Sequence, residues 1–313
     1  MELREGLQAL PRDGSPSVVT IGFFDGVHRG HRNVLARTVE AARERGARSI
    51  AVTFDRHPRE VLTPGSEPRL LTTTRRKAEL IAETGLDELI VLAFTPEFSG
   101  WPADEFVERV LVDGLTAVHI AVGGNFTFGH RALGNVAMLR ALGPARGFTV
   151  EEVPLLRLEG RILSSSSIRD ALAQGDLGWP TTALGRAYAV DGVVVSGAGR
   201  GHGLGYPTAN LRAFPRLLLP KVGIYAGRAR TPLGTRVAAI SVGTNPTFGA
   251  EPLHVEAFLL DFEGELVGQE IAVEFVERLR DEERFDSSRA LIEAIAEDVR
   301  RTRRAVPAED GKP

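Results

Sequence analysis

Residues 20–31 have the sequence Thr-Ile-Gly-Phe-Phe-Asp-Gly-Val-His-Arg-Gly-His, and this stretch decides the fold of the first half of the chain. The apolar run 18–21 in front of it predicts a buried strand, and the apolar spacing of residues 34–42 behind it predicts a helix. Its three glycines permit tight turns and close approach of the backbone. His28 and His31 therefore stand at the start of a helix that directly follows a strand. Sheets of this kind bind ligands there, and helix N-termini favour phosphate.

The two histidines, one helical turn apart, admit three interpretations. They could be metal ligands, although the chain has no cysteine to complete a soft zinc site and only Asp25 lies one turn earlier. They could be surface histidines that bind nothing. They could also form the His-x-Gly-His clamp of nucleotidyltransferases, in which the imidazoles donate hydrogen bonds to ATP phosphates and Gly30 lets the backbone come close.

Length and composition bound the class of protein. The chain has 313 residues, which suggests about two domains, and its net charge of −3 gives no sign of nucleic-acid binding. It contains no apolar run long enough for a membrane span, and the mixed charges of residues 1–15 are not those of a secretory signal. The lack of cysteine excludes disulfides, iron–sulfur clusters and thiol catalysis. We expect a cytoplasmic protein that acts on small molecules, without nucleic acid or membrane as partner, and either a monomer or a weak homo-oligomer.

Strand and helix patterns alternate through the first half. Short apolar runs predict further strands over residues 48–54, 89–94, 117–122 and 150–153. Amphipathic spacing predicts helices over residues 70–85 and 102–111. This alternation predicts an α/β fold with a Rossmann-like parallel sheet and right-handed crossovers. We expect the charged residues of the first of these helices to face solvent, namely Arg75, Arg76, Lys77 and Glu79.

Two loops in this half place aromatic and polar residues at strand ends. Residues 53–58, Thr-Phe-Asp-Arg-His-Pro, leave the second strand, and Pro58 biases His57 away from a helix. Residues 123–129, Gly-Gly-Asn-Phe-Thr-Phe-Gly, leave the fourth strand and could clamp a ribose or stack on an aromatic ring. Each loop could equally be structural: a plain strand exit in the first case, and a mobile loop with buried phenylalanines in the second.

A serine run closes the first half. Residues 161–169 have the sequence Arg-Ile-Leu-Ser-Ser-Ser-Ser-Ile-Arg and lead into a helical pattern. Serines at a helix start cap it and leave backbone donors free. With Ser164 and Ser165 at such a start, Arg161 and Arg169 would complete a pocket for pyrophosphate. A serine run is also typical of a flexible linker.

The pattern changes near residue 185. Glycines and a proline between residues 171 and 188 mark a boundary, so we predict domains over 1–185 and 186–313. Beyond it, strand-like runs recur at short intervals, which predicts a small antiparallel β-barrel with a C-terminal helix over 287–304. We expect residues 306–313 to be a disordered tail. The expected barrel strands cover residues 189–195, 224–230, 237–242, 254–260 and 270–275.

The second half begins with a glycine-rich stretch followed by Pro-Thr-Ala-Asn. Its glycines, Gly203 and Gly205 among them, suit a loop whose N–H groups contact phosphates, although no Walker A sequence is present. After Pro207, the hydroxyl of Thr208 and the amide oxygen of Asn210 lie on one side of an extended segment. Both are hard oxygen donors that suit Mg²⁺. A proline-anchored turn explains the same residues without a ligand.

Three more segments of this half combine polar residues with apolar neighbours. Glu256 stands between apolar residues of a predicted strand, where a half-buried carboxylate suits a proton acceptor. An edge-strand glutamate that faces water would give the same pattern. Residues 241–249 form a polar loop rich in glycine and proline, and residues 278–286, which begin at Arg278, form a charged segment before the last helix.

The stretch Gly-x-Phe-Asp-Gly-Val-His-x-Gly-His at residues 22–31 resembles the nucleotidyltransferase module of prokaryotic bifunctional riboflavin kinase/FAD synthetases. The resemblance continues in matching order through both halves of the chain. Two positions depart from the family pattern: Phe23 stands where Asn is common, and Asn125 where Asp is common. The other matching segments are Thr-Phe-Asp-x-His-Pro at 53–58, Asn-Phe-Thr-Phe-Gly at 125–129, Ser-Ser-x-x-Ile-Arg at 164–169, Pro-Thr-Ala-Asn at 207–210, Gly-Thr-x-Pro-Thr-Phe-Gly at 243–249 and Leu-Arg-x-Glu-x-x-Phe-Asp at 279–286.

The resemblance implies two consecutive reactions. The second half would phosphorylate riboflavin to FMN with ATP, with Mg²⁺ on Thr208 and Asn210 and with Glu256 as the base for the riboflavin 5′-hydroxyl. The first half would adenylylate FMN with a second ATP, giving FAD and pyrophosphate. The residues that would stabilise the reacting phosphates there are His28, His31, Arg161, Ser164, Ser165 and Arg169. Further expected contacts with nucleotide or flavin are Gly22, Phe24, Asp25, Gly30, Phe54, Asn125, Phe126, Gly129, Gly203, Gly205, Pro207, Thr208, Asn210 and Arg278.

Two other functions remain open at this level. The chain could be a nucleotidyltransferase with a single activity and a β-barrel that only binds flavin, although the Pro-Thr-Ala-Asn segment and Glu256 argue against this. It could also be a flavin-binding or regulatory protein without catalysis, against which the intact histidine pair, Arg161 and Glu256 argue.

Overall fold

The computed structural model describes residues 1–197, 206–243 and 253–307 of the chain. Contacts divide it into two compact units, the first formed by Met1–Arg69 and Thr74–Ser165 and the second by Leu70–Thr73 and Ser166–Pro313. The boundary expected at residue 185 stays a prediction about the functional domains. Within the described part of the chain, no helix combines the length and the apolar character needed to cross a membrane.

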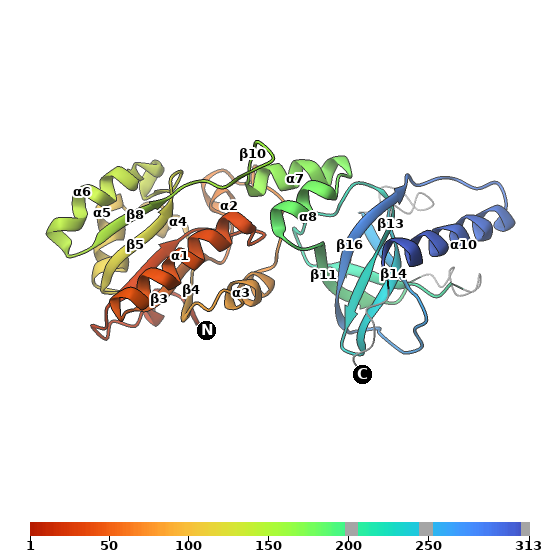
Figure 1. Ribbon diagram of the computed structural model, residues 1–313, viewed down its shortest axis with the longest axis horizontal. Coiled ribbons are helices and arrows are strands. Elements are labelled where there is room, and N and C mark those ends of the chain that lie inside the picture. Colours follow the sequence, from red (N-terminus) through yellow and green to blue (C-terminus); the bar gives the residue numbers. More distant parts are fainter. Residues whose placement is uncertain (198–205, 244–252, 308–313) are drawn as a thin grey trace. The chain divides into compact units, whose positions relative to one another are not determined.

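The first unit is built on a six-stranded sheet in the order β1-β4-β3-β2-β5-β8, in which every neighbouring pair is parallel (Figure 1). This confirms the predicted Rossmann-like parallel sheet. The strands are β1 (Glu2–Glu5), β2 (Ser17–Ile21), β3 (Arg48–Phe54), β4 (Glu88–Leu92), β5 (Ala117–Gly123) and β8 (Thr149–Val153). The other elements are η1 (Leu7–Ala9), α1 (Arg29–Arg45), α2 (Pro58–Leu62), α3 (Thr74–Ala82), α4 (Pro96–Ser99), α5 (Ala103–Phe106), the π-helix η2 (Val107–Val112), η3 (His130–Ala132), α6 (Val136–Arg146) and two short hairpins, β6 (Thr127–Phe128) with β7 (Gly134–Asn135) and β9 (Arg157–Leu158) with β10 (Arg161–Ile162).

The sequence did not predict β1. This strand lies at the sheet edge and pairs in parallel with β4 from Glu2 opposite Glu88 to Glu5 opposite Val91. Its four residues, Glu-Leu-Arg-Glu, are mostly exposed. An edge strand with little buried surface needs no apolar run, so the pattern that marks the inner strands is missing here.

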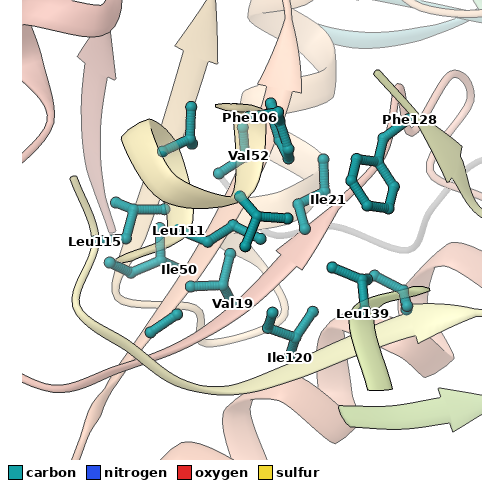
Figure 2. Packing of buried hydrophobic residues seen from close by; sticks show 14 of the residues in the cluster. Val19, Ile21, Ile50, Val52, Phe106, Leu111, Leu115, Ile120, Phe128 and Leu139 are labelled. Carbon is teal, nitrogen blue, oxygen red and sulfur yellow. The ribbon is translucent and has the colours of Figure 1, made fainter. Parts of the chain in front are cut away.

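The sheet is buried on both faces because alternate residues of each strand point to opposite sides. On β3, Ile50 and Val52 belong to one apolar cluster and Ala51 to the other. Figure 2 shows the first cluster, in which Phe106 and Leu111 of the α5–η2 segment pack with the strand residues. The second cluster includes residues of α1 and α3. Burial on both faces explains why the inner strands are continuous apolar runs in the sequence.

One expectation about α3 is wrong. Lys77 does not face solvent: only 3% of it is exposed, whereas the side chains of Arg75 and Glu79 are 71% and 46% exposed. The amphipathic pattern could not show this, because the carbonyls that accept hydrogen bonds from Lys77 are far away in the sequence, at Phe23 in the loop after β2 and at Phe54 at the end of β3.

The second unit contains a closed six-stranded barrel in the order β11-β12-β15-β14-β13-β16, with antiparallel neighbours throughout. The helix α10 (Ser288–Ala305) is capped by Ser287 and lies against β13, β14 and β16 (Figure 1). The barrel and its C-terminal helix are thus confirmed, and β12 is a strand that the sequence showed only as an extended segment. The barrel strands are β11 (Tyr188–Val195), β12 (Ala209–Ala213), β13 (Gly223–Thr231), β14 (Gly234–Gly243), β15 (His254–Leu259) and β16 (Glu270–Arg280), preceded by α7 (Ser165–Gln174) and α8 (Gly178–Leu184).

Two features fix α10 on the barrel. Val306, just beyond the helix, is 1% exposed and packs with Ala226 and Leu279, so the disordered tail expected from residue 306 is wrong for this residue. Arg280 of β16 donates to Asp298 of α10 from Nε and Nη2, at 3.0 and 2.6 Å. The two side chains of this pair are only 19% and 7% exposed.

Replacing Asp298 by alanine should lower the free energy of unfolding by about 3–5 kcal/mol, because Arg280 then keeps a largely buried charge without its partner. Urea unfolding measures this. The matched control is Glu293→Ala on the same helix, which removes the exposed pair with Arg289 (side chains 89% and 66% exposed) and should cost at most about 1 kcal/mol. Equal losses for the two variants would contradict the proposed anchoring of α10.

Candidate active sites

The strand order places the first site. The chain runs from β2 outward to β3 and β4, then crosses to β5 and β8 on the other side of β2. The strands therefore change direction of progression between β2 and β5, and open α/β sheets bind ligands beyond the carboxyl ends of the strands at such a point. The loop of residues 22–28 follows β2, and the loop of residues 124–126 follows β5. The two predicted ligand loops thus flank this position.

The loop after β2 is tightly held in an unusual conformation. Phe24 and Val27 have φ angles of +52° and +40°, which non-glycine residues rarely adopt. Both side chains are buried, as is Asp25 at 3% exposure. A Cβ on Gly22 would lie 2.9 Å from the Phe24 ring, so glycine is required there. Strained backbone of this kind persists only where its surroundings hold it, and it is concentrated at functional sites.

His28 is the N-cap of α1, and this fixes its tautomer. Its Nδ1 accepts the backbone N–H of His31 at 3.2 Å, so in the neutral ring the proton sits on Nε2, which makes Nε2 the donor atom of the ring. The two imidazoles stack with centroids 3.6 Å apart. A Cβ on Gly30 would come within 3.1 Å of the His28 ring, so the glycine makes room for the histidine itself.

His31 is held neutral. Burial keeps its pKa well below the usual value of 6.5, and the neighbouring groups of His28 and Lys77 lower it further. The edge of the Phe24 ring packs on it at 5.4 Å. Among the described residues, its Nδ1 atom is buried and has no hydrogen-bond partner. An orphaned buried nitrogen beside a helix N-terminus suits a ligand atom that the protein does not itself supply.

The serine segment docks on the same loop. Ser165 begins α7, and its Oγ donates to the carbonyl oxygen of Asp25 at 2.9 Å. This brings the second predicted motif to the first. Ser164 immediately precedes α7, and Arg161 is exposed on the β9–β10 hairpin. Arg169 lies one turn further along α7, in the second unit, so its place beside the histidines stays a prediction.

Phe54 and Phe126, two of the aromatic residues expected at the ligand, pack against other aromatic rings. Phe54 packs edge-on against Phe94 at 5.3 Å, and Phe126 stacks on Phe128 at 5.5 Å. Asn125 is exposed in the turn before Phe126. Gly129 has a φ of +71°, and a Cβ there would lie 2.6 Å from the Cα of Ala103. A structural role is thus shown for these phenylalanines and this glycine, and contact with a ligand remains a prediction.

The second site lies on the barrel, where strand pairing assembles it. Asn210 of β12 is directly opposite Glu256 of β15, and Glu256 is opposite Ser241 of β14. Thr208 donates from Oγ1 to Glu256 Oε2 at 3.2 Å. His254 adds its Nε2 at 3.4 Å from the other carboxylate oxygen. The Thr208–Asn210 pair and Glu256, which the sequence predicted separately, are therefore brought together, and His254 joins them.

A cavity of about 290 Å³ opens on this group, at the low end of the ~300–1,000 Å³ typical of ligand sites. Thr208 and Glu256 line it, as do the rings of Tyr206 and Phe258, which meet edge-to-face at 5.2 Å. The alternation of β15 could have revealed this wall, because Glu256 and Phe258, which line the cavity, are half-exposed residues of that strand. The remaining lining residues are Ile224, Ala239, Ile240, Ser241, Arg280, Glu282, Glu283, Phe285, Leu291, Ile295 and Asp298.

Other predicted residues of the barrel have separate positions. Pro207 is exposed just before β12. Arg278 donates to the carbonyl of Val222 at 2.9 Å and pairs with Asp281 at 2.5 Å, and it is the nearby Arg280 that lines the cavity. Gly203 and Gly205, like residues 244–249 of the predicted polar loop, lie outside the described residues.

The chemistry of Thr208 and Asn210 fits Mg²⁺. The amide nitrogen of Asn210 donates to the carbonyl of Thr208 at 3.4 Å, which leaves Oδ1 as the atom that can coordinate a cation. With the Thr208 hydroxyl and the Glu256 carboxylate alongside, the donors are all oxygen, the ligand type that Mg²⁺ prefers.

Comparison with known proteins covers both units. A family model described as FAD synthetase matches residues 10–167, and one described as riboflavin kinase matches residues 184–306. A bifunctional riboflavin kinase/FMN adenylyltransferase from Pseudomonas fluorescens is 39% identical over 300 residues, covering 96% of each chain. Proteins of the same name from Listeria monocytogenes and Escherichia coli are each 34% identical, over 288 and 305 residues, and cover at least 91% of each chain.

One solved structure shares the fold of nearly the whole chain. A crystal structure from Streptococcus pneumoniae, described as a macrolide-efflux protein, superposes with a TM-score of 0.88 at 28% sequence identity. The match covers 97% of this chain and 99% of that one. The likeness therefore extends through both units.

Lowering the pH through 6.5 should destabilise the first unit before His31 takes up a proton in the folded state. In the unfolded chain His31 binds a proton at its usual pKa, whereas in the folded chain it stays unprotonated until a lower pH. The free energy of unfolding therefore falls as the pH falls. NMR titration of the histidine rings should show the His31 signal unchanged at pH 6.5. Urea unfolding at several pH values should show that the free energy of unfolding falls with pH. His31→Asn should reduce this dependence on pH, and the control His130→Asn, at an exposed position, should not change it. A His31 ring that titrates at or above 6.5 would contradict the assignment.

Proposed function

The chain belongs to the family of bifunctional riboflavin kinase/FMN adenylyltransferases, and we propose that the barrel unit converts riboflavin and ATP to FMN and ADP while the sheet unit converts FMN and ATP to FAD and pyrophosphate. The observation that carries this division is that each unit holds its own site: the stacked histidines at the N-terminus of α1, and the Thr208–Glu256 pair in the barrel cavity. The two family models match the same two parts of the chain.

In the kinase step, Glu256 is the base. Its carboxylate faces the cavity and accepts the proton of the riboflavin 5′-hydroxyl as that oxygen attacks the γ-phosphorus of ATP. Tyr206 and Phe258 offer aromatic surface to the flavin ring. Thr208 and Asn210 would hold Mg²⁺, which supplies charge neutralisation on the ATP phosphates. Most of the rate then comes from positioning and electrostatics.

In the adenylylation step, no strong base is needed because the phosphate of FMN is already an anion. It attacks the α-phosphorus of ATP, and pyrophosphate leaves. His28 donates from Nε2, and the N-terminus of α7, where Ser165 contacts the carbonyl of Asp25, adds backbone donors. The group that stabilises the developing charge comprises His28, His31, Arg161, Ser164, Ser165 and Arg169, with His31 neutral and therefore able to donate only one proton.

The two alternatives are less well supported. A nucleotidyltransferase with a barrel that only binds flavin would not need a carboxylate beside a threonine hydroxyl in the cavity, and the riboflavin kinase model matches this half of the chain. A protein without catalysis would not need the stacked histidine pair at the start of α1. Both reactions consume ATP and small flavins, which fits a cytoplasmic enzyme with small molecules as its partners.

His28→Ala should stop the reaction sequence at FMN. Removing one donor to a charged transition state costs about 10²–10³-fold in rate, so FAD formation should fall by that factor while riboflavin phosphorylation stays within twofold. Chromatography of flavins formed from riboflavin, ATP and Mg²⁺ measures both steps in one sample. His130→Ala, at an exposed histidine of the same unit, is the matched control. FAD formation at the wild-type rate would refute the histidine clamp.

Glu256→Gln should have the opposite effect. Loss of a general base costs about 10²–10⁴-fold, so riboflavin phosphorylation should fall by that factor, whereas FMN supplied directly should still become FAD. Glu277→Gln, at an exposed carboxylate of β16, should leave both steps unchanged. If Glu256→Gln and His28→Ala each abolish both reactions in folded protein, the division of labour between the units is wrong.

A further inference from the structure

Lys77 is a buried cation whose hydrogen bonds go to the loop after β2 and to the last two residues of β3. Its Nζ donates to the carbonyl of Phe23 at 3.0 Å, to Thr53 Oγ1 at 3.0 Å and to the carbonyl of Phe54 at 3.2 Å. An ammonium has three donors, so the set is complete. Phe23 lies in the loop after β2, and Thr53 and Phe54 end β3. Lys77 therefore ties the exits of two neighbouring strands together.

These contacts lead directly to the histidines. Thr53 also donates to the Phe23 carbonyl at 3.1 Å, so that oxygen accepts two hydrogen bonds. The next residue, Phe24, has the strained φ of +52°, and its ring packs on His31. Fixing the peptide that joins Phe23 and Phe24 thus fixes the ring that supports His31. The Lys77 ammonium also lies 4.3 Å from the Phe23 ring centroid, a favourable cation–π contact.

Packing alone does not account for this lysine. Burying an ammonium costs free energy even when it is hydrogen-bonded, and an apolar side chain of similar length would fill the space without that cost. Burial lowers the pKa of Lys77 to about 8, with the charges of Asp25 and Asp55 opposing the shift. It is thus mostly protonated at neutral pH, and its charge is one of those felt at His31.

We propose that Lys77 is a positioning residue for FMN adenylylation: it clamps the loop after β2 to the end of β3 and so holds the His28 and His31 rings in place for the ATP phosphates. This rests on the proposed function of the histidine pair. Lys77 touches backbone and Thr53 rather than a reacting atom, so it acts through Phe23 and Phe24.

The chain lacks cysteine, which permits a matched chemical test. Lys77→Cys is alkylated in the unfolded state to give either an aminoethyl cysteine, which restores an ammonium at nearly the same distance, or a propyl cysteine, which has the same size and no charge. Both products are refolded and assayed for riboflavin phosphorylation and for adenylylation of supplied FMN. Arg75→Cys, at an exposed position of the same helix, is treated in the same way as the control.

The propyl product should lose about 10²-fold in kcat/KM for FMN adenylylation, the loss expected from a small displacement of positioned groups. Most of this loss should come from a higher KM for ATP. The aminoethyl product should recover wild-type values within a few-fold, and riboflavin phosphorylation should be unchanged in both. A mere loss of folded protein lowers the apparent kcat and leaves KM unchanged, so the KM for ATP separates positioning from stability.

Three results would overturn the proposal: a propyl product with the wild-type KM for ATP, equal recovery by both products, or a similar change at Arg75. His28→Ala, assayed in parallel, separates the two levels of the argument. If it abolishes FAD formation while the propyl product keeps the wild-type KM for ATP, only the role of Lys77 is wrong. If His28→Ala retains full FAD formation, the proposed function of the histidine pair fails, and the role of Lys77 fails with it.

Discussion

A single hydrogen bond at the start of α1 organises the first unit: His28 Nδ1 accepts the backbone N–H of His31. It caps the helix, sets the tautomer that leaves Nε2 protonated, and stacks the second imidazole on the first. The position matters as much as the bond, because the strand order turns at β2 and β5 and so creates the ligand crevice beside this helix end. The strained loop before His28 connects β2 to α1 and so positions the His28 ring at the carboxyl end of the sheet.

In the barrel unit, the register of strand pairing positions the residues of the second site. Antiparallel pairing of β12 with β15 sets Asn210 opposite Glu256, and Thr208 donates a hydrogen bond to the same carboxylate. This is the arrangement that the proposed kinase step uses. A slip of one residue in this register would turn the glutamate to the other face of the sheet. In the barrel unit, therefore, strand pairing positions the side chains of the proposed site, whereas in the first unit a helix cap and the loop before it do so.

The sequence predicted what depends on local pattern. The inner strands of the sheet are apolar runs, the barrel strands recur between turns, and the motifs at residues 22–31 and 207–210 stand where strands end or begin. It missed β1, whose exposed edge needs no apolar residues, and the burial of Lys77, whose acceptors are distant in sequence. The cavity escaped prediction for the same reason: Tyr206, Arg280 and Leu291 come from separate segments that only the barrel and α10 bring together. Local periodicity carries no information about contacts between segments that are far apart in the sequence.

The central claim is that two separate sites on one chain each grip the phosphates of an ATP molecule, and a crystal structure with ATP, Mg²⁺ and FMN bound tests it most directly. We predict one nucleotide with a phosphate oxygen about 3 Å from His28 Nε2 and a second with its Mg²⁺ on Thr208 and Asn210. A first unit whose nucleotide makes no contact with either imidazole, or a barrel without a metal beside the Thr208–Asn210 pair, would contradict the account.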